Sequence, residues 1–127
     1  MNQQITIENL SKLFGDFTIN LNLLWIALVI GIIMDFATGI AKAYRENGKL
    51  SSSKLRDGGF KKCGIIFVVI MSLGFSKLFC DTYFVITNSV LCYYIYTEIV
   101  SILENLNEMG IPLPPIFSKI IGKKSED

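Results

Sequence analysis

Three long uncharged segments define the pattern of apolar and polar residues along this chain. They cover residues 17–34, 63–76 and 82–97, with 18, 14 and 16 residues. A bilayer core about 30 Å thick requires roughly 20 mostly apolar residues per helix. The first segment is long enough alone, and the other two are long enough if each helix continues past a flanking charge. The pattern therefore predicts an all-α integral membrane protein with three transmembrane helices.

Turn signals and charges place the helix boundaries within a single domain, residues 1–127. After a polar lead-in, we expect helix 1 at 19–44, a basic loop at 45–61 and helix 2 at 62–79. The Asn47-Gly48 and Gly58-Gly59 pairs are typical of turns. Helix 3 is expected at 81–103, with an amphipathic C-terminal extension to 109 and a tail at 110–127. A two-helix alternative, with residues 63–79 re-entrant, stays open because the second apolar segment is short.

Composition narrows the class of protein without indicating any chemistry. Of the 127 residues, 51% are hydrophobic and 18% are charged, against about 25% charged in soluble domains. The chain has no histidine, and Cys63, Cys80 and Cys92 lack a CxxC spacing, so we expect buried apolar cysteines and neither metal nor cofactor. The sequence shows no phosphate-binding loop, nucleophile–base pair or basic nucleic-acid stripe, which argues against an enzyme and a nucleic-acid partner. The N-terminal residues lack a cleavable signal pattern, so helix 1 is expected to remain as an anchor.

Basic residues concentrate between the first and second apolar segments. Residues 42–62 carry a net charge of +5, whereas the side chains of the N-terminal lead-in sum to −1. Cytoplasmic loops hold the excess of lysine and arginine, so we expect this loop inside, the N-terminus outside and the C-terminus in the cytoplasm. Near the membrane surface each basic residue also attracts anionic lipid by about 1 kcal/mol. The basic residues are Lys42, Arg45, Lys49, Lys54, Arg56, Lys61 and Lys62.

Two carboxylates stand inside or beside the apolar segments. Trp25 and Tyr44, of types that favour membrane interfaces, are nineteen positions apart, about 28 Å along a helix, which puts Asp35 near mid-depth. A carboxylate at that depth must face protein or water, unless the span is shifted and Asp35 sits at an interface. Glu98 is the second such residue, with an interfacial position as its alternative. Small residues recur with Asp35 at every fourth position and suit close contact between helices, namely Ala27, Gly31, Gly39 and Ala43.

Several spaced elements of the sequence form a recognisable series. The first is an apolar helix ending in Asp-x-x-Thr-Gly, here Asp35, Thr38 and Gly39. The second is a basic Ser-Ser loop that leads into Lys61 and Lys62. The third is an acidic block closed by a Gly-Ile-Pro-x-Pro segment, formed by Glu98, Ser101, Glu104, Asn105, Gly110, Pro112 and Pro114. Over roughly residues 20–117 the chain resembles the toxin-secretion/phage-lysis holin family, although Thr97 replaces an expected asparagine.

This resemblance implies a non-enzymatic protein that self-associates in the bacterial cytoplasmic membrane and opens lesions at a set time. An endolysin or a protein toxin then leaves the cell without being specifically bound, and the proton gradient collapses. In that setting we hypothesise that oligomers hide Asp35 against neighbouring helices until triggering turns it toward water. One alternative is a small ion- or proton-conducting subunit with Asp35 and Glu98 as a relay. Another is a regulatory membrane protein that binds a partner through residues 104–115.

Overall fold

Three long helices and one short helix make up the described part of the chain. The computed structural model describes the backbone of residues 2–82 and 84–125, and the side chains of residues 8, 9, 12, 23–46, 48–82 and 84–122. The helices are α1 (Asn2–Asn47), α2 (Ser52–Leu78), α3 (Val85–Glu108) and α4 (Pro115–Ser125). Three segments are long and apolar enough to cross a membrane: Leu23–Glu46, Ser52–Leu78 and Val85–Glu108. The predicted all-α class and the three membrane-length helices are confirmed.

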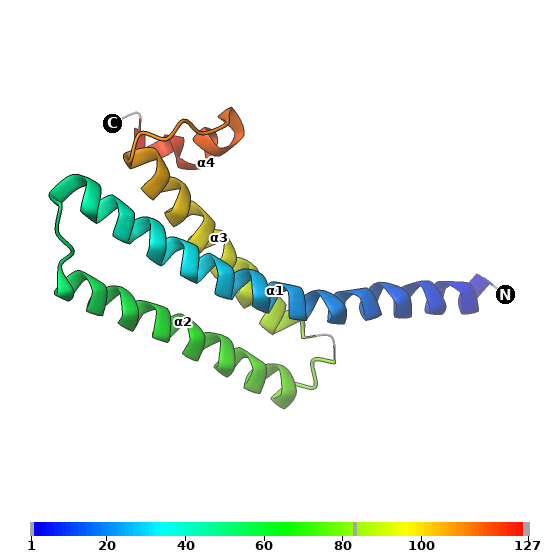
Figure 1. Cartoon of the computed structure of the whole chain (residues 1–127). Coiled ribbons are helices and arrows are strands. Elements are labelled where there is room, and N and C mark those ends of the chain that lie inside the picture. The colour runs from blue at the N-terminus through cyan, green and yellow to red at the C-terminus, as the bar shows by residue number, and fades with distance from the viewer. Residues whose placement is uncertain (1, 83, 126–127) are drawn as a thin grey trace.

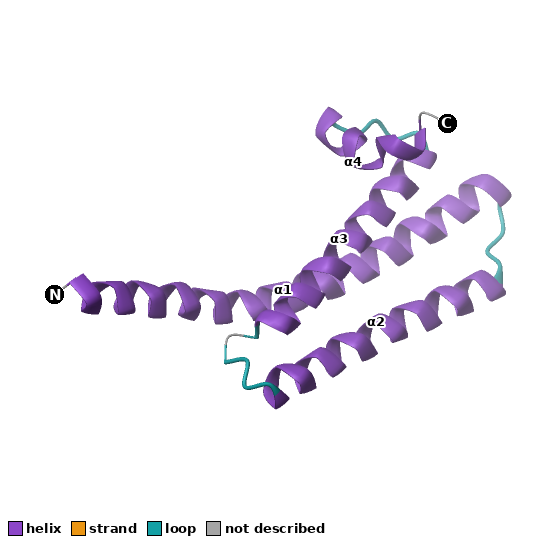
Figure 2. Ribbon diagram, turned by 180° about the vertical axis from the view of Figure 1, so that it is seen from behind, coloured by secondary structure: helices purple, strands orange, loops and turns teal. Residues whose placement is uncertain are grey.

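The three long helices form a bundle centred on α3. Helix α3 packs along α1 and also contacts α2, and α4 packs against α3. Helices α1 and α3 run in the same direction and α2 runs opposite to both (Figure 1). The α1–α2 turn, the C-terminal end of α3 and α4 lie toward one end of the bundle, which we call the α4 end. The α2–α3 turn lies at the other end, from which the N-terminal part of α1 projects (Figures 1 and 2).

Residues in the left-handed region end all three membrane-length helices. Gly48 follows α1 at φ 63° and Gly110 follows α3 at φ 81°. Glycine adopts this conformation without steric strain because it has no Cβ. Helix α2 ends instead on Cys80 at φ 55°. The N–H of Asp81 there donates to the Ser76 carbonyl at 2.8 Å, the hydrogen bond of a Schellman cap. Each connection therefore starts at a hydrogen-bonded helix end.

The sequence predicts a basic loop at 45–61. This prediction is wrong in extent, because α2 already begins at Ser52. The connection that remains covers residues 48–51. The Gly58-Gly59 pair does not form the expected turn. A Cβ added at Gly58 would lie 3.7 Å from the ring of Phe36, so this part of α2 lies within van der Waals reach of a side chain of α1.

The other helix boundaries also differ from those expected. Helix α1 begins at Asn2 instead of 19, because no proline or other strong helix breaker separates the polar lead-in from the apolar segment. Helix α3 begins at Val85 instead of 81, since the turn after α2 occupies residues 79–84. Residues 104–108 continue α3 without a break, and the tail folds into α4, whose first residue is Pro115. Proline is favoured there because the first helical N–H has no intrahelical partner.

The most buried apolar contact of the bundle takes one residue from each long helix. Leu28 is 1% exposed, and Val69 and Leu91 are both 0% exposed. We call these three residues the apolar layer. By contrast, the outer surface carries large apolar side chains such as Ile33 and Phe67, which are 61% and 68% exposed. An apolar exterior around a small packed interior is the arrangement expected of helices surrounded by lipid.

Candidate functional site

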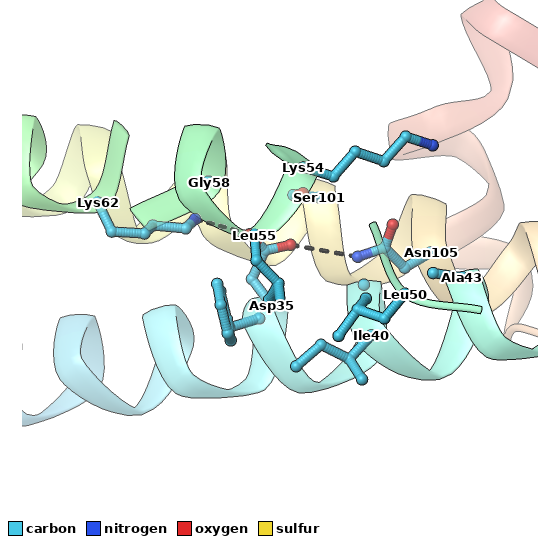
Figure 3. Close-up of a pocket in the computed structure, with 12 residues that line it drawn as sticks. Asp35, Ile40, Ala43, Leu50, Lys54, Leu55, Gly58, Lys62, Ser101 and Asn105 are labelled. Carbon is cyan, nitrogen blue, oxygen red and sulfur yellow. Dashed lines mark hydrogen bonds and ion pairs between the residues drawn. The ribbon is translucent and has the colours of Figure 1, made fainter. Parts of the chain in front are cut away.

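One charged side chain from each membrane-length helix meets the others inside the bundle. Lys62 Nζ of α2 lies 2.6 Å from Asp35 Oδ2 of α1 and 2.5 Å from Glu98 Oε2 of α3. Glu98 is 1% exposed, while the side chains of Asp35 and Lys62 are 12% and 18% exposed. We call these three residues the charged cluster. Figure 3 shows Lys62 reaching Asp35 from one side and Asn105 from the other.

The charged cluster lies near the middle of the three membrane-length segments. Within Leu23–Glu46, Asp35 has 12 residues before it and 11 after it. Glu98 stands within two residues of the centre of Val85–Glu108, and Lys62 stands three from the centre of Ser52–Leu78. At the rise of an α-helix these offsets are within about 5 Å of mid-depth. The charged cluster therefore lies near the middle of the three apolar segments within the described residues, and the mid-depth position of both carboxylates stays a prediction.

A glycine lets α1 and α3 approach closely beside the charged cluster. A Cβ added at Gly31 would lie 3.2 Å from Glu98 Cβ, tighter than ordinary van der Waals contact. Gly31 is one helical turn before Asp35, so the same close approach brings the two carboxylates toward one ammonium group. Small residues at such positions are the usual means by which membrane helices pack backbone to backbone.

Neutral polar groups extend the charged cluster toward the α4 end. The amide nitrogen of Asn105 donates to Asp35 Oδ1 at 3.3 Å and to Thr38 Oγ1 at 3.1 Å. The Thr38 hydroxyl in turn donates to the Met34 carbonyl at 2.9 Å, within its own helix. Asp35 is therefore bonded through both carboxylate oxygens, one to Lys62 and the other to Asn105.

The charged cluster carries a formal net charge of −1. An isolated charge in an apolar interior is strongly disfavoured, and a buried pair is tolerated only when geometry and further hydrogen bonds offset desolvation. Lys62 is shared between Asp35 and Glu98, so one cation serves two anions. Lys62 is therefore the link that ties α1 and α3 to α2.

A pocket of about 240 Å³ adjoins the charged cluster and extends toward the α4 end. Its walls come from α1, α2, α3 and the α1–α2 connection, and its polar lining includes Asp35, Lys62, Ser101 and Asn105. Lys54 belongs to its rim, and its ammonium extends away from Asp35 (Figure 3). The pocket thus connects the charged cluster with the basic end of the bundle.

The small residues singled out with Asp35 occupy different surroundings. Gly31 and Gly39 both face α3, where a Cβ at Gly39 would lie 3.8 Å from Asn105 Nδ2. Ala43 lines the pocket. Ala27, at the other end of this series, is exposed.

The basic residues do not form one continuous patch. Lys62 belongs to the charged cluster, and Lys42 forms an ion pair with Glu108 of α3. A guanidinium nitrogen of Arg45 lies 3.9 Å from the Cβ position of Gly110. The remaining basic residues of this group are exposed, namely Lys49, Lys54, Arg56 and Lys61. Basic charge therefore surrounds the α4 end, with one lysine drawn inside.

The acidic block near the C-terminus contributes selectively to the site. Glu98 and Asn105 bond to the other helices, and Ser101 lines the pocket between them. Glu104 is partly buried, Gly110 ends α3, and Pro112 and Pro114 are exposed in the connection to α4. Thr97 is exposed and donates to the Tyr93 carbonyl of its own helix at 2.9 Å.

Lys62 is the central residue whose role the sequence analysis missed, because it was counted with the basic residues of 42–62 at the expected start of helix 2. A signal for its true position exists in the sequence. Once α2 is extended back to Ser52, its inward-facing residues follow the three-and-four spacing of one helix face. These residues are Leu55, Gly58, Lys62, Ile65, Val69, Ser72 and Ser76.

The cysteines differ from the expectation of buried thiols. Cys63, Cys80 and Cys92 are free and exposed on the surface of the bundle. Among the described residues, no group of three histidine, cysteine, aspartate or glutamate side chains is placed to hold a metal ion. The arrangement at the charged cluster is suited to holding helices together, exchanging protons and binding water.

Comparison with known proteins gives a family and several relatives. The chain matches the bacteriophage holin family over residues 9–125. It is 31% identical over 103 residues to an uncharacterised 14.9 kDa protein in the nagH 3′ region of Clostridium perfringens, covering 80% of this chain and 74% of that protein. An uncharacterised Listeria monocytogenes protein is 31% identical over 126 residues, covering 95% and 88% of the two chains. One from Listeria innocua is 30% identical over 119 residues, covering 93% and 83%. No solved structure matches the chain.

Proposed function

Because the chain belongs to the bacteriophage holin family, we propose that it accumulates in the bacterial cytoplasmic membrane, self-associates and opens lesions there. The family match over residues 9–125 carries this proposal and confirms the resemblance drawn from the spaced sequence elements. Holins are non-enzymatic membrane proteins. The cargo of the lesion is an endolysin or a protein toxin, which passes without a dedicated binding site, and the partners are lipid and other copies of this chain.

The size of the bundle supports assembly from many copies. The space between the three helices is taken up by the charged cluster, the apolar layer and a pocket of about 240 Å³. A folded enzyme is far larger than that pocket, so one chain does not enclose a hole of the required width. The apolar exterior, with Phe60 and Tyr93 71% and 66% exposed, offers surface for lipid or for other copies.

The charged cluster suits a closed resting form. Asp35 finds its partners within the same chain, on α2 and α3, which replaces the hypothesis that neighbouring molecules must cover it. In an open lesion, helices that separate would present Asp35, Lys62 and Glu98 to water. Charged side chains of this kind line water-filled pores in membrane proteins. We therefore propose two roles for the charged cluster. It holds the three helices together in the closed form, and it lines the water-filled lumen in the open form.

Charge distribution supports one orientation in the membrane. Exposed Lys49, Lys54 and Arg56 lie at the α4 end, whereas Lys77 at the opposite end is followed closely by Asp81. Because basic residues are retained in the cytoplasm, the proposal places the α4 end and the C-terminus inside and the N-terminus outside.

The function is tested by inducing the chain in bacteria together with a cytoplasmic endolysin. Membrane potential, culture turbidity and release of a cytoplasmic reporter enzyme are followed in parallel. We expect a delay, then loss of potential, and release of the endolysin at the same time, because protein-sized lesions pass both ions and enzymes.

Cultures that express the endolysin alone, or this chain alone, provide the controls. Loss of potential with full retention of both enzymes would contradict the holin function and support an ion conductor. If the membrane potential stays unchanged and both enzymes are retained, the result would support a binding protein that opens no lesion. Either result overturns the proposal.

A further inference from the structure

A second polar layer lies inside the bundle near the α2–α3 turn. The hydroxyls of Ser76 and Thr87 are 2.9 Å apart and both residues are 0% exposed. Asn88 is 3% exposed, and neither its amide nitrogen nor its amide oxygen has a hydrogen-bond partner among the described residues. Buried amides are normally bonded, and ordered water supplies the bonds where protein does not. Asn88 therefore marks a site for water inside the bundle.

Toward the α4 end of the bundle, the pocket beside the charged cluster has room for water. Its volume of about 240 Å³ is large enough for several water molecules, since one occupies about 30 Å³ in the liquid. Asp35, Ser101 and Asn105 supply the polar partners that ordered water requires. Lys54 at the rim is exposed at the basic end of the bundle. The pocket is thus a vestibule that opens toward the α4 end.

The apolar layer separates the site at Asn88 from the pocket beside the charged cluster. Each of its members lies seven residues, or two helical turns of about 10 Å in total, from the charged residue of the same helix. The pairs are Asp35 with Leu28, Lys62 with Val69, and Glu98 with Leu91. Because α2 runs opposite to α1 and α3, all three members fall on the same side of the charged cluster, away from the pocket. Asn88 lies one turn beyond Leu91 on α3.

We propose that the interior of a single bundle is a path for protons, closed at rest by the apolar layer. A proton from water in the vestibule joins a carboxylate of the charged cluster, which changes the net charge of the cluster from −1 to 0. When the apolar layer becomes wet, the proton continues through a chain of water molecules to Asn88 and the α2–α3 turn. Apolar constrictions close membrane pores in this way, by excluding water. This path requires one inserted chain and no protein-sized lesion.

Proton flux into liposomes tests the path. The full-length chain is reconstituted at a low protein-to-lipid ratio in vesicles that contain a pH-sensitive dye and a labelled dextran. A potassium diffusion potential drives protons inward. We expect Leu91→Ser to raise the proton flux by at least about tenfold over the unsubstituted chain, because a polar residue lets water enter the apolar layer. The dextran stays inside.

Matched variants separate the path from other causes of leakage. Cys92→Ser makes a polar change at the next residue of α3, on the exposed surface, and should leave the flux unchanged. Adding Glu98→Gln to Leu91→Ser should lower the raised flux several-fold, because a proton acceptor is lost while Asp35 and Lys62 remain as a neutral pair. A Leu91→Ser flux equal to that of Cys92→Ser, or loss of dextran together with protons, would overturn the proposal.

Thiol labelling gives a second test, which does not require the Leu91→Ser variant to fold. In a variant without native cysteines, Ser101→Cys should react with a charged, impermeant thiol reagent added at the α4 end. Leu91→Cys should not react. An unreactive Ser101→Cys would disprove the vestibule, and equal reactivity at both positions would disprove the apolar seal. Neither assay requires a protein-sized lesion, and the retained dextran reports that none has formed, so failure of the holin function leaves both assays interpretable.

Discussion

At the scale of single residues, Lys62 has more influence on the bundle than either carboxylate. Its ammonium lies within 2.6 Å of one oxygen on α1 and 2.5 Å of another on α3. Loss of Asp35 or Glu98 alone would leave a neutral pair. Loss of Lys62 would leave two carboxylates facing each other in an apolar interior, with nothing in the cluster to balance them.

We expect Lys62→Met to destabilise the bundle by roughly 3–5 kcal/mol, the usual cost of removing one partner from a buried ion pair. Unfolding by a denaturing detergent in mixed micelles, followed by circular dichroism, measures this. Lys61→Met is the matched control, since Lys61 is adjacent and exposed. The triple change Asp35→Asn, Lys62→Met and Glu98→Gln should recover most of the loss, because neutral groups of similar shape replace the charges. Equal stability of the two lysine variants would refute this role.

The two carboxylates of the charged cluster could be identified from sequence and their cation could not. Asp35 and Glu98 interrupt or border apolar segments, so the sequence alone indicates a buried charge at each position. Lys62 follows Lys61 in a basic stretch, where a solvated loop is the simpler interpretation. Which charges pair is decided by the rotation of α2 about its own axis, a property that composition does not contain.

At the scale of elements, contact between α1 and α3 depends on the absence of a side chain at Gly31. The distance of 3.2 Å from its Cβ position to Glu98 Cβ leaves no room for a larger residue without movement of a helix. Such movement would also pull Asp35 away from Lys62, because Gly31 and Asp35 lie on the same face of α1. Helix packing and the charged cluster are therefore coupled.

Gly31→Val should destabilise the bundle by about 1–3 kcal/mol through overpacking. Gly74→Val is the control, because nothing lies within 4 Å of the Cβ position of Gly74 in α2. That change should be neutral or slightly stabilising, since glycine inside a helix costs about 0.5–1 kcal/mol relative to alanine. The same detergent titration measures both variants. A smaller loss for Gly31→Val than for Gly74→Val would contradict the close approach.

The three membrane-length helices could be predicted because a bilayer imposes a minimum apolar length. Their ends were harder to predict. Gly48 and Gly110 are recognisable stop signals, whereas α2 stops on Cys80, a residue type that rarely adopts positive φ. Conversely, the Gly58-Gly59 pair reads as a turn but lies within α2, where Gly58 packs near Phe36. In both cases the residue type alone gave the wrong signal for where the helix ends.

At the scale of the whole molecule, the proposed topology has three membrane crossings, which would put the two ends of the described chain on opposite sides of the membrane. The connection at 48–51 and the C-terminal helix α4 lie toward one end of the bundle, and the turn residues 79–82 and 84 lie at the other (Figure 1). The proposed orientation places the α4 end in the cytoplasm, on the expectation that basic residues are retained there.

Alkaline phosphatase, which is active only outside the cytoplasm, reports this orientation when fused to truncated chains. We expect an inactive enzyme after residue 49, an active one after residue 82 and an inactive one after residue 122. A fluorescent protein that matures only inside should give the reverse pattern at the same three positions. Inactive phosphatase at residue 82 would instead support the re-entrant alternative for residues 63–79, and a fully inverted pattern would reverse the proposed orientation.

The charges of the cluster alternate in sign along the chain, which has a consequence for biogenesis. The ribosome delivers Asp35 first, Lys62 27 residues later, and Glu98 a further 36 residues later. At about 5–20 residues per second, Asp35 waits roughly 1–5 s for its counter-ion. The α1–α2 hairpin is then electrically neutral at its centre before α3 is made. In the proposed membrane topology, α3 is inserted after Lys62, the partner of its own carboxylate Glu98, so the order of translation is also an order of assembly.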